Sequence, residues 1–208
     1  MYSKIQYISQ GATALQQLDA VKNALDAGCT WVQLRFKDAT EIEVLKLSSR
    51  VKKVIEGYAC TYIINDYPHI AKEIGADGIH LGLDDMPVEK AREIIGPNKI
   101  IGGTANTLTH VMQRCKEQCD YIGLGPYRFT ATKEKLSPVL GLQGYIDIMQ
   151  HLKRHNVQMP IYAIGGILQD DIPAILHAGI YGVALSALIT NHPHKKELLT
   201  NLNTLCSH

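Results

Sequence analysis

Short β-branched runs alternate with amphipathic helical segments from one end of the chain to the other. The runs of the first half are IQYISQ, WVQLRFK, TYIIND and GIHLG, and those of the second half are KIIGGTA, YIGLGP, IYAIGGI and GVALSALI. Each is followed by a segment in which apolar residues recur with the helical period. Because a period near two indicates strands and a period near 3.6 indicates helices, the pattern predicts eight consecutive strand–helix units.

The length of the chain limits how these units can be arranged. Its 208 residues, divided among eight units, leave 26 for each, which is close to a minimal strand–helix unit and leaves no room for a second domain. We therefore expect residues 1–208 to form a single (β/α)₈ TIM barrel, with its active site at the C-terminal mouth of the strands. A doubly wound open sheet is the alternative, and it is less favoured because eight regular units without a long insertion close more readily.

Composition and charge narrow the class of partner. A hydrophobic content of 46% predicts a packed core, and a formal net charge of +1 gives no basic field for nucleic acid or an anionic membrane. The five cysteines are an odd number and favour a reducing compartment, with Cys115 and Cys119 as buried thiols rather than zinc ligands. The start MYSKIQYISQ does not resemble a signal peptide, so we expect a cytoplasmic protein.

The second expected strand carries cations on one face. Alternation in WVQLRFK directs Val32, Leu34 and Phe36 towards the helices. The opposite face points into the barrel, where unpaired cations are unfavourable, and it consists of Gln33, Arg35 and Lys37. A bound anion would satisfy these cations; the alternative is that they form ion pairs with carboxylates of the protein itself.

Two acidic residues follow neighbouring strands. Asp66 comes directly after the third expected strand, and Asp85 follows the fourth. Each alone is more simply explained as a helix cap, because Asp66 precedes a helical stretch and Pro87 is typical of a helix start. Together, beside inward-facing cations, they resemble oxygen ligands for Mg²⁺, which binds one or two carboxylates plus a substrate phosphate.

Backbone anion sites are expected on the other side of the mouth. Gly165 and Gly166 follow the seventh strand, and Leu185 and Ser186 end the eighth. The loops after these strands form the recurring phosphate site of the fold, although paired glycines also serve tight turns.

The longest non-periodic segment is GPYRFTATKEKLSP, residues 125–138, between the sixth strand and the sixth helix. It brings Thr130, Thr132 and Lys133 to the mouth, whereas Arg128 and Lys135 are equally compatible with solvent exposure.

The formal charge of the expected site favours a diphosphate. Arg35, Lys37 and Lys133, set against Asp66 and Asp85, leave +1, and Mg²⁺ raises this to +3. With the second anion site, this predicts Mg²⁺-assisted transfer from a diphosphate to a monophosphorylated substrate.

Six motifs together resemble the thiamine phosphate synthase family over nearly the whole chain. In order they are VQLRFK (32–37), IINDY (63–67), GADGIHLGLDDMP (75–87), IIGGTANT (100–107), DYIGLGPYRFTATK (120–133) and AIGGI (163–167). The resemblance implies that hydroxymethylpyrimidine diphosphate is joined to hydroxyethylthiazole phosphate. The products are thiamine monophosphate and pyrophosphate, and the mechanism is dissociative, through a carbocation.

The same resemblance assigns roles to residues. It places Mg²⁺ on Asp66 and Asp85. It places the diphosphate on Arg35, Lys37, Asn65 and Lys133. It places the pyrimidine near Gln33 and Thr104, and the thiazole phosphate on Thr130, Thr132 and the backbone of Gly166 and Leu185–Ser186. Among these, the resemblance makes Arg35, Lys37, Lys133 and Thr104 the catalytic residues, with a homodimer as the assembly common in the family.

Three positions depart from the family pattern. Leu83 stands where Gln is usual, Thr104 replaces a frequent Ser, and Asn106 stands where His is frequent. A thiazole tautomerase-like barrel that uses a His for proton transfer is one alternative function, and it is disfavoured by Asn106 and the intact Thr-Ala-Thr-Lys segment. A non-catalytic barrel that binds a phosphorylated ligand is the other. His80, inside the fourth expected strand, is interpreted as a hydrogen-bonded barrel histidine.

Overall fold

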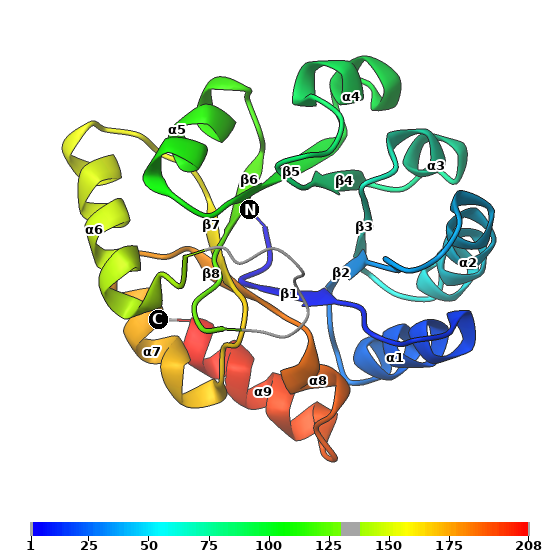
Figure 1. The fold of residues 1–208 in the computed structure, drawn as a ribbon. Helices are drawn as coiled ribbons and strands as arrows, with labels where there is room; N and C mark the ends of the chain where they lie inside the picture. Colours follow the sequence, from blue (N-terminus) through cyan, green and yellow to red (C-terminus); the bar gives the residue numbers. More distant parts are fainter. Residues whose placement is uncertain (1, 130–137, 208) are drawn as a thin grey trace.

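The computed structural model describes residues 2–129 and 138–207 and contains a closed barrel of parallel strands in sequence order (Figure 1). This confirms the expected (β/α)₈ TIM barrel. The strands are β1 Ile5–Ile8, β2 Trp31–Leu34, β3 Thr61–Asn65, β4 Gly78–Leu81, β5 Ile100–Ala105, β6 Tyr121–Leu124, β7 Ile161–Ile164 and β8 Gly182–Leu185. Pairing of β1 with both β2 and β8 closes the sheet.

Helices surround the barrel as an outer ring (Figure 1). They are α1 Ala14–Asp26, α2 Glu41–Ile55, α3 Pro68–Glu73, α4 Val88–Ile95, α5 Leu108–Lys116, α6 Gly141–Arg154, α7 Ile172–His177, α8 Ala187–Thr190 and α9 Lys195–Cys206, with a 3₁₀ turn η1 at Gln169–Asp171. The last position of the ring is filled by α9, which contacts α7, α1 and β1. In the part of the chain that the structure describes, no helix is both long and apolar enough to cross a membrane.

Local sequence explains where the first two helices begin. The Thr13 side chain accepts the Gln16 backbone N–H while the Gln16 side chain accepts the Thr13 N–H, and Thr40 and Glu43 repeat the arrangement before α2. Such capping boxes satisfy N–H groups that the first turn of a helix leaves unpaired. They therefore fix the ends of the loops that follow β1 and β2, where two parts of the site lie.

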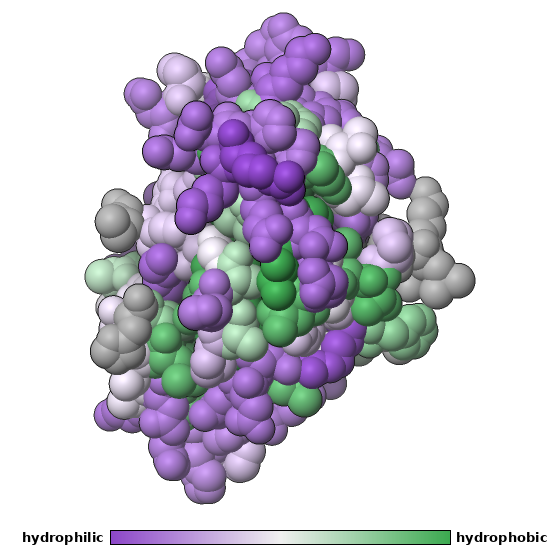
Figure 2. Space-filling view, turned by 90° about the vertical axis from the view of Figure 1, so that its left-hand side faces the viewer, coloured by the Kyte–Doolittle hydropathy of each residue, from purple (hydrophilic) through white to green (hydrophobic). Residues whose placement is uncertain are grey.

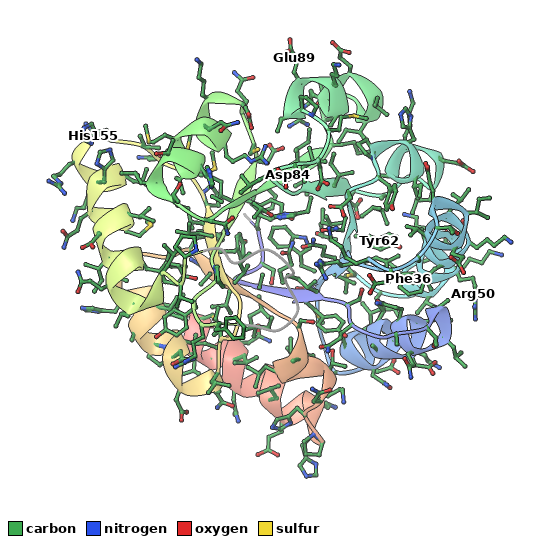
Figure 3. All side chains as sticks on the ribbon, viewed as in Figure 1. Phe36, Arg50, Tyr62, Asp84, Glu89 and His155 are labelled. Carbon is green, nitrogen blue, oxygen red and sulfur yellow. The ribbon has the colours of Figure 1, made fainter. Side chains whose placement is uncertain are left out.

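Apolar side chains fill two separate regions. The larger lies between the strands and the helices, where Tyr62 of β3 reaches α2 and donates its hydroxyl hydrogen to the Ser48 carbonyl (Figure 3). The smaller lies inside the barrel and consists of Trp31, Ile63, Tyr121, Tyr162 and Ala184.

Polar side chains cover the outside of the molecule. Arg50, Glu89 and His155 project outwards from the helix ring (Figure 3). The side of the molecule that carries α6 is mainly hydrophilic, with a narrow apolar strip at its centre (Figure 2). All five cysteines are free thiols.

Two expected strands are shorter than their hydrophobic runs. β8 ends at Leu185, and the following Ala187–Thr190 forms α8 instead of extending the run GVALSALI. β2 ends at Leu34, so Arg35 and Lys37 belong to the loop after the strand. Phe36 still packs against the outer core, as its place in the alternation predicted.

Candidate active site

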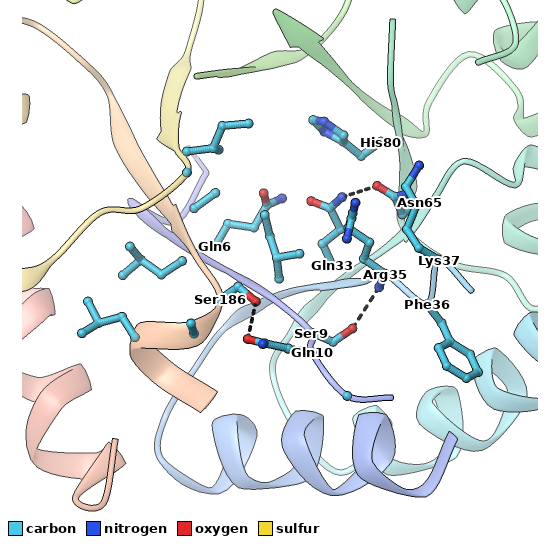
Figure 4. A pocket seen from close by; sticks show the side chains of 18 of the residues that line it. Gln6, Ser9, Gln10, Gln33, Arg35, Phe36, Lys37, Asn65, His80 and Ser186 are labelled. Atoms are coloured by element: carbon cyan, nitrogen blue, oxygen red, sulfur yellow. Dashed lines mark hydrogen bonds between the residues drawn. The ribbon is translucent and has the colours of Figure 1, made fainter. Parts of the chain in front are cut away.

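One pocket opens where the strand-to-helix loops converge, with a volume of about 410 Å³ (Figure 4). It is bordered by the ends of β1, β2, β7 and β8 and by the loops that follow them. The residues predicted from sequence that line it are Gln33, Arg35, Lys37, Asn65, Thr104, Gly166, Leu185 and Ser186. The strand ends and the loops after them therefore bring these groups together around one pocket, and their roles in binding stay predictions.

Gln33 and Asn65 form a buried amide pair at the bottom of this pocket. The Gln33 Nε2 donates to Asn65 Oδ1 over 2.7 Å, and only 2% of Gln33 is exposed (Figure 4). Gln33 Oε1 is buried and has no hydrogen-bond partner among residues 2–129 and 138–207. A buried amide oxygen that accepts no hydrogen bond destabilises the folded protein by about 1–3 kcal/mol. The Gln33 oxygen therefore favours a ligand that brings an N–H group.

Arg35 is held at the pocket wall by its backbone. Its N–H donates to Ser9 Oγ over 2.9 Å, and its carbonyl accepts from Gln17 Nε2 at 3.1 Å. Burial lowers the pKa of the Arg35 guanidinium, while the nearby carboxylates of Asp66, Asp38 and Asp85 raise it. Because arginine remains charged in proteins, this side chain keeps its cation in a poorly solvated place.

Lys37 reaches from the same loop to the end of β3. Its Nζ lies 3.2 Å from Asp66 Oδ2, and 49% of its side chain is exposed. This is the internal ion pair that the sequence left open as an alternative to a bound anion. Since the ammonium is half exposed, the pair adds little stability and leaves Lys37 available to a ligand.

Asp66 has an unusual backbone conformation and an unusual charge environment. Its φ is 68°, a left-handed value that is uncommon for residues other than glycine. Burial first, and then the hydrogen bond with Asp85 and the Asp85 charge, raise the pKa of its carboxyl to about 6, while Lys37 opposes the shift. The two acids from neighbouring strands therefore meet.

Neither acid caps a helix. The N-cap residues of α3 and α4 are Tyr67 and Pro87, and neither makes a side-chain capping bond. Asp85 Oδ2 instead accepts the Gly82 N–H at 2.5 Å within its own loop.

This pair fits a hard divalent cation. Two converging carboxylates are the protein ligands that Mg²⁺ typically uses, with water and substrate oxygens completing its octahedron. No group of three or more His, Cys, Asp or Glu side chains suited to a metal occurs in the described parts of the chain. Asp66 and Asp85 lie outside the pocket lining; Asp66 contacts the lining residue Lys37, and Asp85 contacts Asp66.

The glycine turn after β7 forms the opposite wall. Gly165 and Gly166 have φ values of 89° and 70°, which explains why both are glycine. Arg128, whose role the sequence left open, donates to the Gly166 carbonyl over 3.0 Å and to both carboxylate oxygens of Asp171. Arg128 thus braces this turn rather than simply facing solvent.

The turn after β8 lies beside it. Ser186 Oγ, next to Leu185, donates to Gln10 Oε1 over 3.3 Å (Figure 4). Thr130, Thr132, Lys133 and Lys135 lie outside the described residues.

The remaining sequence predictions fall near β4 and β5. His80 is buried and hydrogen-bonded, as expected, with Thr104 Oγ1 and the Tyr121 hydroxyl each 3.0 Å from its ring nitrogens. Asn106 is buried and donates its side-chain N–H to the Gly125 carbonyl. Leu83, two residues before Asp85 in the chain, is an exposed apolar residue.

Sequence analysis missed the contribution of β1. Gln6, Ser9 and Gln10 line the pocket, and the alternation of IQYISQ already placed Gln6 opposite the apolar Ile5 and Tyr7. The polar residues on the inner face of the first strand would have allowed these pocket residues to be predicted.

A closed barrel with cations, acids and a glycine turn at its mouth defines a (β/α)₈-barrel protein with charged groups gathered around one pocket. Comparison with known sequences is more specific: the profile described as thiamine monophosphate synthase matches residues 7–189. The chain belongs to this family.

Individual relatives agree with this assignment. A thiamine-phosphate synthase of Flavobacterium psychrophilum is 54% identical over 98% of both chains, and one of Phocaeicola vulgatus is 47% identical over 89% of both. The solved thiamine phosphate pyrophosphorylase from Pyrococcus furiosus superposes with a TM-score of 0.82 at 28% identity, covering 98% of this chain and 95% of its own. A 3-hexulose-6-phosphate synthase, with a TM-score of 0.73 at 15% identity over 99% of this chain and all of its own, shares the fold alone.

Proposed function

We propose that this protein is a Mg²⁺-dependent thiamine-phosphate synthase of the diphosphorylase type. It transfers the hydroxymethylpyrimidine group from its diphosphate to hydroxyethylthiazole phosphate, giving thiamine monophosphate and pyrophosphate. One observation carries the proposal. Two cations lie close to two acids at the edge of a pocket that also contains a glycine turn. The cations are Arg35 and Lys37, and the acids are Asp66 and Asp85.

The reaction begins with heterolysis of a C–O bond. Both electrons leave with the diphosphate, and a carbocation remains on the methylene carbon attached to the pyrimidine. Arg35 and Lys37 stabilise the charge that develops on the leaving oxygens, with Lys133 proposed as a third cation and Asn65 as a further contact. Asp66 and Asp85 would hold a Mg²⁺ ion, which would supply positive charge against the diphosphate oxygens.

The second step forms the new bond. The lone pair of the thiazole nitrogen adds to the carbocation, and no proton has to be removed, so the site needs no general base. Backbone N–H groups at Gly166 and near Leu185–Ser186, with Thr130 and Thr132, hold the thiazole phosphate in this proposal. Their contribution is to orient the nucleophile over the methylene carbon.

The amide pair supports an aminopyrimidine as the electrophile. Gln33 Oε1 is a buried acceptor whose partner is absent from the described residues, and an exocyclic amino group supplies the N–H that it requires. Thr104 lines the same pocket and offers a hydroxyl for a ring nitrogen.

The decisive experiment mixes purified protein with both phosphorylated substrates and Mg²⁺ and follows thiamine monophosphate by its fluorescent oxidation product. We expect product that disappears with EDTA and in Asp85→Ala, but persists in Asp19→Ala, which removes an exposed carboxylate on α1. Absence of product from the wild type, despite binding of the thiazole phosphate, would contradict the proposal and favour a tautomerase-like or ligand-binding barrel.

A further inference from the structure

A row of hydrogen bonds crosses the inside of the barrel and ends at the pocket. Gln6 Nε2 donates to the Tyr121 hydroxyl over 3.0 Å, and this hydroxyl lies 3.0 Å from His80 Nδ1. His80 Nε2 lies 3.0 Å from Thr104 Oγ1. Residues from β1, β6, β4 and β5 are thus linked in one sequence of contacts, of which Gln6, His80 and Thr104 line the pocket.

The chemistry of the first member favours one direction for the others. An amide N–H₂ only donates, so the Tyr121 oxygen accepts from Gln6 and has one hydrogen of its own to give. His80 Nδ1 lies 3.0 Å away, within reach of that hydrogen, and a ring that accepts it there has no hydrogen on Nδ1. Nε2 then carries the ring hydrogen and donates to Thr104 Oγ1, which leaves the Thr104 hydrogen for another acceptor.

The surrounding packing keeps these groups in place. A Cβ at Gly102 would lie 2.1 Å from Tyr121 Cζ, and one at Gly123 would lie 3.2 Å from His80 Cε1. The absent side chains therefore make the space for both rings. Trp31 and Tyr162 hold the Tyr121 ring from other sides, with ring centroids 5.0 and 5.6 Å away.

The environment also keeps Tyr121 a neutral donor. Burial raises the pKa of its hydroxyl, and the Gln6 hydrogen bond opposes the shift. The hydroxyl therefore retains its hydrogen throughout the physiological range.

We propose that Tyr121 and His80 are positioning residues that hold the Thr104 hydroxyl as a hydrogen-bond donor to the pocket. They thereby select a ligand that presents an acceptor, such as an aromatic ring nitrogen, at that point. With the opposite His80 tautomer, Thr104 would donate to the histidine and present an acceptor instead. The inference rests on the proposed function only for the identity of the ring, which is the pyrimidine.

The test compares Tyr121→Phe with Tyr162→Phe, which removes a hydroxyl from the same aromatic cluster. The Tyr162 hydroxyl donates to the Ser3 carbonyl over 2.6 Å and takes no part in the row. Long-range ¹H–¹⁵N NMR of the ligand-free protein reads the His80 tautomer, and steady-state kinetics give separate KM values for the two substrates.

We expect the Nε2–H tautomer in the wild type and in Tyr162→Phe, and a tautomer mixture in Tyr121→Phe. In Tyr121→Phe the KM for the pyrimidine diphosphate should rise about tenfold, as expected for one lost hydrogen bond, while the KM for the thiazole phosphate changes less than about twofold. If Tyr121→Phe does not fold, Gln6→Leu removes the first donor and should shift the tautomer in the same direction.

The outcomes separate this inference from the proposed function. An active wild type with the Nδ1–H tautomer, or a Tyr121→Phe variant indistinguishable from Tyr162→Phe, overturns the inference and leaves the function standing. A wild type that makes no thiamine monophosphate overturns the function, and the NMR measurement alone then decides whether Tyr121 sets the tautomer.

Discussion

The Lys37 ammonium lies 3.2 Å from the Asp66 carboxylate, yet the pKa of Asp66 remains raised, at about 6. Burial and the neighbouring Asp85 together outweigh the single, half-exposed ammonium. Poor solvation of the Asp66 carboxylate is the larger cause of this raised pKa, and the neighbouring Asp85 is the second. The raised pKa has consequences for stability and for metal binding that can be measured separately.

Without metal, the Asp66 carboxyl should make the stability of the protein fall as pH rises from about 4 to about 6. Its pKa is higher in the folded than in the unfolded chain, so the folded state binds more protons in this window. Asp66→Asn should remove this pH dependence, which amounts to about 1–3 kcal/mol of unfolding free energy. Urea unfolding at a series of pH values in EDTA measures it, with Asp19→Asn as the control. If the unfolding free energy of Asp66→Asn changed with pH in parallel with that of the wild type, Asp66 would not be the source of the pH dependence.

Mg²⁺ should stabilise the folded protein and displace protons near pH 6. At that pH the Asp66 carboxyl is about half protonated, so binding should release up to about half a proton per site. Calorimetry in buffers of different ionisation enthalpy measures the proton release. The variants Asp66→Asn and Asp85→Asn should bind Mg²⁺ weakly and release almost no protons. K⁺ at matched ionic strength serves as the control. Unchanged Mg²⁺ affinity in both variants would place the metal elsewhere.

Arg128→Met should weaken binding at the glycine turn without disturbing the diphosphate side. The Arg128 guanidinium holds both Asp171 and the Gly166 carbonyl, so its loss frees the turn that is proposed to bind the thiazole phosphate. We expect the KM for this substrate to rise about three- to tenfold, as for the loss of one or two hydrogen bonds. Arg128→Lys should not restore it, because an ammonium lacks the planar fork.

The control for the Arg128 variants is Arg154→Met, which removes an exposed cation at the end of α6. Equal increases in both KM values for Arg128→Met would indicate general loosening of the barrel mouth instead of a brace on one turn.

Gly102→Ala should destabilise the barrel strongly. Its new Cβ would meet the Tyr121 ring at 2.1–2.5 Å, and that ring is fully buried. We expect a loss of about 3 kcal/mol or more of unfolding free energy, above the usual effect of overpacking because the ring has no room to move. Chemical unfolding measures this against Gly57→Ala, where the nearest atom lies at 3.6 Å. Similar stability of the two variants would show that the inner ring can shift.

The alternation of hydrophobic patterns was sufficient to predict the barrel and one side of its mouth. Gln33 was placed at the pocket from the period of a single strand. The same period placed Arg35 on that strand, whereas it lines the pocket from the loop after β2. Asp66, predicted from its position after the next strand, contacts Lys37 just outside the pocket lining. Local periodicity determines which side of a strand a residue occupies, and the C-terminal ends of parallel strands share one edge. These are properties that a sequence carries within a few residues.

The row of hydrogen bonds through Tyr121 and His80 could not be predicted in the same way. Its members come from strands far apart in sequence, and which of them meet depends on the stagger of the closed barrel. Gly102 and Gly123 were nevertheless a signal, because glycine inside a strand marks close approach of another group. Arg128 and Asp171 likewise required the structure, since 43 residues separate them.

Closure of the barrel joins the first strand to the last. Ile5 and Tyr7 lie opposite Val183 and Leu185, and the Lys4 carbonyl accepts the Val183 N–H at 2.8 Å. During synthesis, β1 leaves the ribosome first and waits with an unpaired edge until some 180 further residues have followed. The nascent chain therefore acquires its pocket, whose wall includes residues on both sides of this seam, only after β8 has been synthesised.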